Sequence, residues 1–268
     1  CGRYAEHKEL LAALEQEVFY YQGTEFIAWA EDRLVEEMQS FLGFPLVETR
    51  LISGQMANMT VFSALVDFLN RTDRRREPRR IPLVMNNHIG KGGHLSSQPM
   101  GALRDYVAKD PVTEKYSILN FPVLEDNPYR IDLKETANLL DRFDPELIIL
   151  GKSMILHPEP VAAIRKMLDT KSTRPVIMYD MAHVLGLIGP HFQNPFAEGA
   201  DIITGSTHKT FYGSQRGVIG ATYEEGAPEF ELWKAIERRA FPGAVSNHHL
   251  GTLLGLLMAT LEMNAFKD

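Results

Sequence analysis

The chain of 268 residues has little cysteine and no long apolar run. Its single cysteine, Cys1, excludes an internal disulfide framework and is typical of a reducing compartment. No uninterrupted apolar run reaches membrane-spanning length, and no signal-like segment is present. Basic residues are also fewer than acidic ones: the chain has 28 Lys and Arg and 35 Asp and Glu, which gives a net charge of -7. These absences predict a cytoplasmic protein with no membrane partner and no nucleic-acid partner.

The residues that are present are those of one large α/β domain. Hydrophobic residues make up 44% of the chain and charged residues 24%, as in globular proteins. The basic run 71–80 is the exception to the acidic balance, and we expect it to form a solvated loop between a helix and a strand. The sequence stops inside an apolar helical pattern, 250–266, without a stop signal. We therefore expect residues 1–268 to form the large domain of a longer polypeptide whose small domain is absent here.

Hydrophobic periodicity predicts an alternation of helices and strands. Apolar residues at helical spacing predict a helix over 25–42. Further helices are expected at 59–69, 133–143, 160–168 and 250–266. Strands are expected at 47–52, 81–85, 116–123, 147–150, 176–179, 200–204 and 217–222. This alternation favours a mostly parallel sheet with helices on both faces, which binds ligands beyond the carboxyl ends of its strands.

Lys209 is the first candidate for chemistry. It follows His208 and a Gly-Ser-Thr run directly after the strand-like residues 202–204. A lysine held by rigid backbone suits a Schiff base to an aldehyde cofactor, although a lysine chosen at random is more often a surface residue. Asp180 ends an earlier strand, where an aspartate can pair with the pyridinium nitrogen of pyridoxal phosphate (PLP). Asp180 is equally a candidate helix N-cap, and both interpretations can hold together.

Two glycine-containing segments add candidates. Ser53-Gly54-Gln55 follows a strand and opens a helix, a geometry that offers free backbone N–H groups to an anion or serves as an ordinary cap and turn. His94 follows Gly92-Gly93. An imidazole there can stack on a flat cofactor ring or have a structural role.

Taken in order, these segments resemble the serine hydroxymethyltransferase family of fold-type I PLP enzymes, and the archaeal-type members in particular. The resemblance covers nearly the whole chain. It implies the PLP-binding large domain of a fold-type I transferase, an α/β fold with a mostly parallel mixed sheet and helices on both faces. Its landmarks are Tyr4-Ala-Glu6, Tyr20-Tyr-Gln-Gly23, Ser53-Gly-Gln-Met-Ala-Asn58, Gly93-His-Leu95, Asp180-Met-Ala-His183 and Thr207-His-Lys-Thr210.

The resemblance implies a role for each matching position around the cofactor. Lys209 would bind PLP as a Schiff base, and Asp180 would pair with the ring nitrogen. His94 and Ala182 would cover the two faces of the ring. The remaining cofactor-binding residues would be Ser53, Gly54, Gln55 and His208 at the phosphate, and Ser153 and His183 at the phenolic oxygen.

The resemblance also implies the substrate residues and the assembly. Tyr4 and Glu6 would approach the amino acid, with Glu6 moving protons, and Tyr21 would line a pocket of a neighbouring subunit in a homodimer. With Lys209, Asp180 and His94, the residues Tyr4 and Glu6 form the expected catalytic set. No metal is implied. The arginine that grips the substrate carboxylate is expected outside this chain.

Three functions remain open at this point. The resemblance favours a hydroxymethyltransferase that interconverts serine and glycine with tetrahydrofolate or tetrahydromethanopterin. The longer helical stretch 7–18 and Val245-Ser-Asn-His-His249, which replaces the family's common glycine pair, motivate a pterin-independent threonine aldolase or transaldolase. The third possibility is a PLP-binding scaffold without catalysis, which has no need of the full set of catalytic residues.

Overall fold

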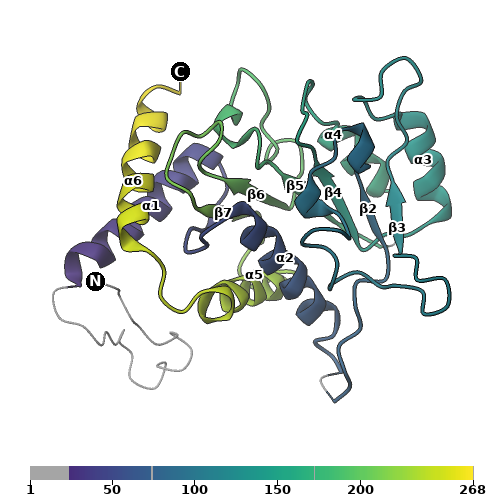
Figure 1. Ribbon diagram of the computed structural model, residues 1–268, viewed down its shortest axis with the longest axis horizontal. Helices are drawn as coiled ribbons and strands as arrows, with labels where there is room; N and C mark the ends of the chain where they lie inside the picture. Colours follow the sequence, from purple (N-terminus) through teal and green to yellow (C-terminus); the bar gives the residue numbers. More distant parts are fainter. Residues whose placement is uncertain (1–23, 74, 172, 268) are drawn as a thin grey trace.

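The computed structural model describes residues 24–73, 75–171 and 173–267, and a seven-stranded sheet runs through this part of the chain. The spatial order of its strands is β1-β7-β6-β5-β4-β2-β3 (Figure 1). The strands are β1 (Leu46–Glu48), β2 (Val84–Asn86), β3 (Ile118–Asn120), β4 (Leu147–Gly151), β5 (Val176–Asp180), β6 (Ile202–Ser206) and β7 (Gly217–Ala221).

The sheet is mixed, with a parallel majority. Strands β3, β2, β4, β5 and β6 pair in parallel, whereas β7 runs antiparallel to both β6 and β1. Parallel neighbours bring their carboxyl ends to one edge. The ends of β2, β4, β5 and β6 therefore share the edge at which the sequence predicts a ligand site.

Helices cover both faces of the sheet, as predicted. One face packs against α1 (Glu25–Leu42), α3 (Leu133–Arg142), α4 (Val161–Leu168) and α6 (Leu250–Ala265). The other face packs against α2 (Gly54–Leu69) and α5 (Phe230–Arg238), which lie in front of the sheet in Figure 1. Along β4, Ile148 and Leu150 join the first core and Leu147 and Ile149 the second, the two-residue alternation of a strand buried on both sides.

The structure differs from the sequence prediction mainly at element ends. The strand expected over 47–52 stops at Glu48, because the buried guanidinium of Arg216 binds the carbonyls of Thr49 and Arg50. The helix expected from 59 begins at Gly54, directly after the N-cap Ser53. The prediction did not include α5, although Trp233 and Ile236 repeat at helical spacing and are buried.

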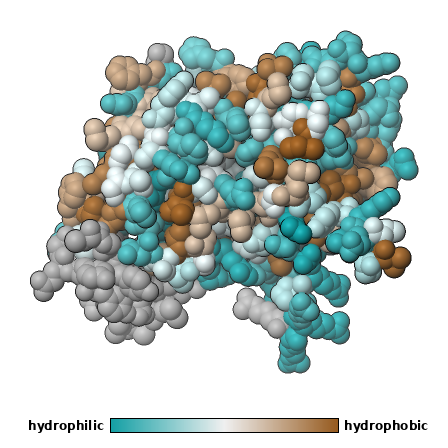
Figure 2. All heavy atoms as spheres, in the orientation of Figure 1, coloured by the Kyte–Doolittle hydropathy of each residue, from teal (hydrophilic) through white to brown (hydrophobic). Residues whose placement is uncertain are grey.

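The loop that follows α2 projects from the body of the molecule and is hydrophilic (Figure 2). It contains the basic run 71–80, and the described arginines of this run between 75 and 80 are exposed. The prediction of a solvated loop between a helix and a strand is therefore confirmed. Among the described helices, none combines the length and the apolar character that crossing a membrane requires.

Candidate active site

The carboxyl edge of the sheet brings the predicted cofactor residues together. Asp180 is the last residue of β5, Lys209 follows the end of β6 by three positions, and Ser153 follows the end of β4 by two. His94 lies in the loop after β2, and Ser53 caps α2. Residues from five separate segments thus converge through the order of the strands.

Asp180 is the centre of a buried hydrogen-bond cluster. Its carboxylate is 1% exposed, and Oδ2 accepts from Asn58 Nδ2 at 2.8 Å and Ser97 Oγ at 3.0 Å. His94 Nδ1 lies 2.6 Å from the same oxygen. The other oxygen, Oδ1, accepts from the backbone N–H of Ala182 at 3.1 Å. The cluster holds the carboxylate in one orientation at the strand end.

These contacts also determine the charge of Asp180. Burial by itself would raise the pKa of this carboxyl, but the hydrogen bond and charge of His94 and the hydrogen bonds from Asn58 and Ala182 lower it below its usual value. Asp180 is therefore ionised at neutral pH. Since an ionised carboxylate only accepts hydrogen bonds, the Nδ1 atom of His94 carries the hydrogen that lies between the two groups.

Lys209 lies half-buried next to His183. The Nζ atom of Lys209 and the Nε2 atom of His183 are 3.3 Å apart. Burial lowers the pKa of Lys209, and the charge of Asp180 opposes that shift. Burial and the charges of Lys209 and His94 lower the pKa of His183 to about 4. A neutral imidazole beside an amine of lowered pKa favours the uncharged, nucleophilic form of the lysine.

A closed backbone turn positions this lysine. The Thr207 hydroxyl accepts from the N–H of Arg216 at 2.9 Å and donates to the carbonyl of Ser214 at 2.6 Å. The N–H of Gly213 binds the carbonyl of Thr207 at 2.7 Å. The segment from 207 to 216 is therefore fixed by hydrogen bonds, in agreement with the expectation of a lysine held by rigid backbone. Gly205 and Ser206 belong to β6, which ends two residues later than the expected strand 200–204.

His94 contacts both His183 and Asp180. The rings of His94 and His183 meet edge to face, with centroids 5.1 Å apart. The ring of His94 therefore lies beside the carboxylate of Asp180 and beside His183, the neighbour of Lys209. Stacking of His94 on a cofactor ring stays a prediction.

The N-terminus of α2 packs closely against the end of β6 and the start of β7, and we call the concave backbone surface formed by Ser53, Gly54, Ser206 and Gly217 the cup. A Cβ atom on Gly54 would lie 2.1 Å from Ser206 Oγ, and one on Gly217 would lie 2.1 Å from the carbonyl of Ser53. The Ser53 hydroxyl accepts from the N–H of Met56 at 3.1 Å. Within the described residues the N–H groups of Gly54 and Gln55 have no acceptor. This is the free-donor geometry that binds anions at a helix start.

The other predicted site residues lie around these groups or outside the described part. Ser153 and His208 are exposed, and Ala182 is buried at 1% exposure. Burial and the charge of Lys209 lower the pKa of His208. The roles of Ser153, His208, Ala182 and Gln55 stay predictions. Tyr4, Glu6, Tyr21 and the stretch 7–18 lie outside the described residues.

Sequence reasoning missed the neutral partners of Asp180. Asn58 also donates to Ser96 Oγ at 2.7 Å and accepts from the Thr204 hydroxyl at 2.5 Å, so it links α2, β6 and the segment after His94. The sequence carries little signal for this role, because Asn58 lies just before the predicted helix 59–69 and is one of several polar residues of α2. A buried asparagine there requires partners.

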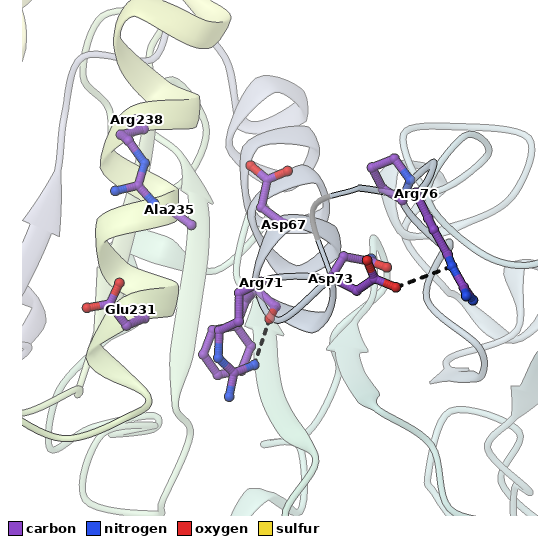
Figure 3. A pocket seen from close by; sticks show the side chains of 10 residues that line it. Asp67, Arg71, Asp73, Arg76, Glu231, Ala235 and Arg238 are labelled. Carbon is purple, nitrogen blue, oxygen red and sulfur yellow. Dashed lines mark hydrogen bonds and ion pairs between the residues drawn. The ribbon is translucent and has the colours of Figure 1, made fainter.

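A separate hollow of about 530 Å³ lies at the opposite end of α2, between its C-terminus and α5 (Figure 3). Its charged lining residues are Asp67, Arg71, Asp73, Arg76, Glu231 and Arg238. Sixteen helical residues at 1.5 Å each place the C-terminus of α2 about 24 Å from the cup. The hollow contains none of the predicted site residues.

The fold is that of fold-type I PLP enzymes. It superposes on a crystal structure of L-threonine transaldolase from Pseudomonas fluorescens with a TM-score of 0.70, covering 91% of this chain and 49% of that one, at 23% sequence identity. The family model for serine hydroxymethyltransferase matches residues 17–265. The chain belongs to the serine hydroxymethyltransferase family.

Relatives in this family agree with the archaeal resemblance. The chain is 35% identical to serine hydroxymethyltransferase of Archaeoglobus fulgidus over 250 residues, which is 93% of this chain and 50% of the relative. The corresponding protein of Korarchaeum cryptofilum is also 35% identical, over 92% of this chain and 53% of the relative. The chain therefore spans about half the length of the relatives it matches.

Proposed function

We propose that the protein containing this chain uses PLP to interconvert serine and glycine with a tetrahydrofolate-type one-carbon carrier. The observation that carries the proposal is the half-buried Lys209 amine, 3.3 Å from His183 and on the same sheet edge as the buried, ionised Asp180, in a chain of this family. A PLP-binding scaffold would need this lysine, but it would have no need of the buried, ionised Asp180, whose charge serves the breaking of a bond at the α-carbon.

Three features of the structure fit PLP. The cup at Gly54 has free backbone donors for a phosphate, and Lys209 supplies an amine for an aldehyde. The Oδ1 atom of Asp180 accepts one hydrogen bond, from Ala182, and can accept another from a protonated ring nitrogen. Because Oδ2 already has three partners, the carboxylate stays oriented while Oδ1 retains an unused acceptor position.

The chain's own residues then have separate tasks. When bound, PLP would draw electrons from the α-carbon of the amino acid so that a bond to this carbon can break. Asp180 would hold a proton on the ring nitrogen through its negative charge. The backbone of Ser53, Gly54 and Gln55 would bind the phosphate, and Lys209 in its uncharged form would attack the aldehyde. Glu6 would move the proton of the substrate hydroxyl.

The assembly and location follow from the same proposal. Residues near the cup and the lysine loop expose apolar surface, with Tyr212 84% and Ile52 40% exposed. A second copy of the chain would cover this surface, which supports a homodimer in which Tyr21 reaches the neighbouring pocket. A small amino acid would be the substrate, and the scarcity of cysteine supports a cytoplasmic location.

The decisive experiment has two arms, both on the complete natural polypeptide. Borohydride reduction of the cofactor-loaded protein should fix the cofactor on Lys209, as located by peptide mass spectrometry, and Lys209→Ala should bind no reducible cofactor. Serine cleavage should then depend on added carrier. Carrier-independent cleavage of threonine at a higher rate would instead indicate the aldolase or transaldolase, and cofactor binding without either cleavage would indicate a scaffold.

A further inference from the structure

A fully buried lysine, Lys152, lies beside the site, and the proposed chemistry does not use it. Lys152 directly follows β4, and its Nζ atom lies 2.6 Å from Glu159 Oε1. The two side chains are 1% and 3% exposed. Lys152 also donates to the carbonyl of Tyr129 at 2.8 Å. The ion pair therefore closes the loop from 152 to 159, which carries Ser153.

This ion pair is not explained by packing alone. Burial raises the pKa of Glu159, and the charge of Lys152 opposes that shift. The second carboxylate oxygen, Oε2, is buried and accepts no hydrogen bond of normal geometry from the described residues, although the nearby side chain of Asn87 lowers the pKa of Glu159. Apolar pairs of similar volume often stabilise a fold as well as a buried ion pair or better. A role in orienting the attached backbone is a better reason for these two charges.

The backbone of Lys152 is joined to the segment that carries His94. Lys152 forms an antiparallel bridge with Gly93. On either side of this bridge, the N–H of His94 binds the carbonyl of Gly151 at 2.9 Å, and the N–H of Ser153 binds the carbonyl of Gly92 at 2.8 Å. Any movement of Lys152 would shift both loops together.

The backbone of Glu159 is joined to the strand that carries Asp180. The side-chain amide of Gln193 binds both backbone groups of Glu159: it accepts from the N–H at 3.1 Å and donates to the carbonyl at 2.6 Å. Gln193 Oε1 also accepts from the hydroxyl of Tyr179, the neighbour of Asp180 in β5, at 3.1 Å. The ion pair thus connects the ends of β4 and β5 with the His94 loop.

We propose that Lys152 and Glu159 are positioning residues that fix the His94 and Ser153 loops around Asp180 for cofactor binding. The proposal rests on the proposed PLP function. It deepens that function by assigning a task to two residues that have no role in the proposed chemistry. The ion pair acts through two backbone hydrogen bonds, those of the His94 and Ser153 N–H groups.

The test compares Lys152→Met, Glu159→Gln and the double variant Lys152→Met/Glu159→Met in the complete natural polypeptide. The control is Lys166→Met, which removes an exposed lysine from the next helix. Amide hydrogen exchange of His94 and Ser153 is measured without cofactor, and the dissociation constant of PLP is measured by absorbance titration. Thermal unfolding reports stability separately.

The single variants should exchange these two amides roughly tenfold faster, because the opening of a local unit becomes easier. They should also bind PLP about tenfold more weakly, as expected when a supporting contact of a binding group is lost. The double variant should recover thermal stability, but it should recover neither the slow amide exchange of His94 and Ser153 nor the affinity for PLP. The control should match the wild type in all three measurements.

The proposal is wrong if the double variant recovers wild-type amide protection and PLP affinity, because the two charges would then only compensate each other. It is also wrong if the single variants lose stability with no change at His94 and Ser153. Glu159→Gln keeps an acceptor for the lysine, so it provides the comparison if Lys152→Met does not fold. A wild-type protein that binds no PLP would contradict the proposed function, while the amide measurement would still decide the positioning role.

Discussion

Two buried aspartates lie at opposite ends of the neighbouring strands β5 and β6, and their partners differ. Asp201, just before β6, contacts Arg165 at 2.5 Å and Arg174 at 3.2 Å, so two guanidinium groups neutralise it. Asp180, at the end of β5, contacts one histidine and otherwise neutral donors. The charge of Asp201 is compensated by two arginines, whereas the charge of Asp180 is held by hydrogen bonds.

This difference distinguishes a carboxylate paired with arginines inside the fold from the one that we propose to hold the cofactor's ring nitrogen. Both residues are almost fully buried, so burial by itself does not distinguish them. The distinction lies in whether a permanent cation already compensates the charge. Substitutions at the two aspartates should affect the protein more strongly than substitutions at their neighbours.

The largest effect is expected for Asp180→Asn. Loss of the negative charge should reduce exchange of the α-proton of glycine by about 10²–10⁴-fold, because the protonated ring nitrogen would lose its partner. The measurement is proton exchange in D₂O by NMR with saturating PLP. Near-normal exchange in this variant would show that another residue holds the ring nitrogen.

Asp201→Asn should act on stability and leave the chemistry unchanged. Arg165 has a side chain that is 12% exposed and would lose its carboxylate, which costs about 3 kcal/mol of unfolding free energy. Denaturant unfolding measures the loss, and proton exchange per folded molecule should stay at the wild-type rate. A fall in that rate similar to the fall in Asp180→Asn would remove the contrast between the two aspartates.

Asn58→Ala should have an intermediate effect, because it should lower the free energy of unfolding and also change the pKa of Asp180. It removes a hydrogen bond to the ionised Asp180 and leaves Thr204 and Ser96 without their partner, a loss of about 2 kcal/mol. The pKa of Asp180 should rise, because one of the hydrogen bonds that lower it disappears. The matched control is Asn138→Ala on the exposed face of α3. Equal destabilisation by both variants would contradict the role of Asn58.

The smallest effect concerns pH. The pKa of His183 is about 4 in the folded protein, below its ordinary value of 6.5. The unfolded chain therefore binds more protons as the pH falls below 6.5, so the contribution of His183 to stability is complete above that pH and is lost toward pH 4. The ring is partly exposed, so we expect a loss of about 1 kcal/mol. Unfolding of His183→Gln should show a flatter pH dependence in this range, and an unchanged slope would contradict the assignment.

The sequence predicted the fold well where one local signal sets an element. The helix α1 has its predicted bounds because Gly43, at a φ of 72°, ends it with a left-handed residue whose N–H binds the carbonyl of Gln39. Strand β1 was predicted too long, since the side chain that ends it, Arg216, lies more than 160 residues further along the chain. Local patterns contain no information about such a partner.

The site was predictable for residues with distinctive chemistry. Lys209 and Asp180 were singled out because an amine and a carboxylate directly after apolar strands have distinctive chemistry, and His94 because it follows two glycines and matches a family landmark. The supporting residues Asn58, Ser96, Ser97 and Thr204 have ordinary side chains whose importance comes from meeting at one carboxylate. The pairing of Lys152 with Glu159 was likewise not visible from spacing, because the loop between them has no helical repeat.

The base of the basic loop after α2 has a use in protein engineering. The side-chain amide of Asn70 accepts from the N–H of Arg79 at 2.9 Å and donates to the carbonyl of the same residue at 2.8 Å. These two hydrogen bonds join the first and last parts of the loop, so the position of the end of α2 does not depend on the residues between them. Lengthening a loop whose ends are already fixed adds little entropic cost. A fluorescent label or an affinity tag placed at the tip should therefore leave the sheet and its carboxyl edge undisturbed.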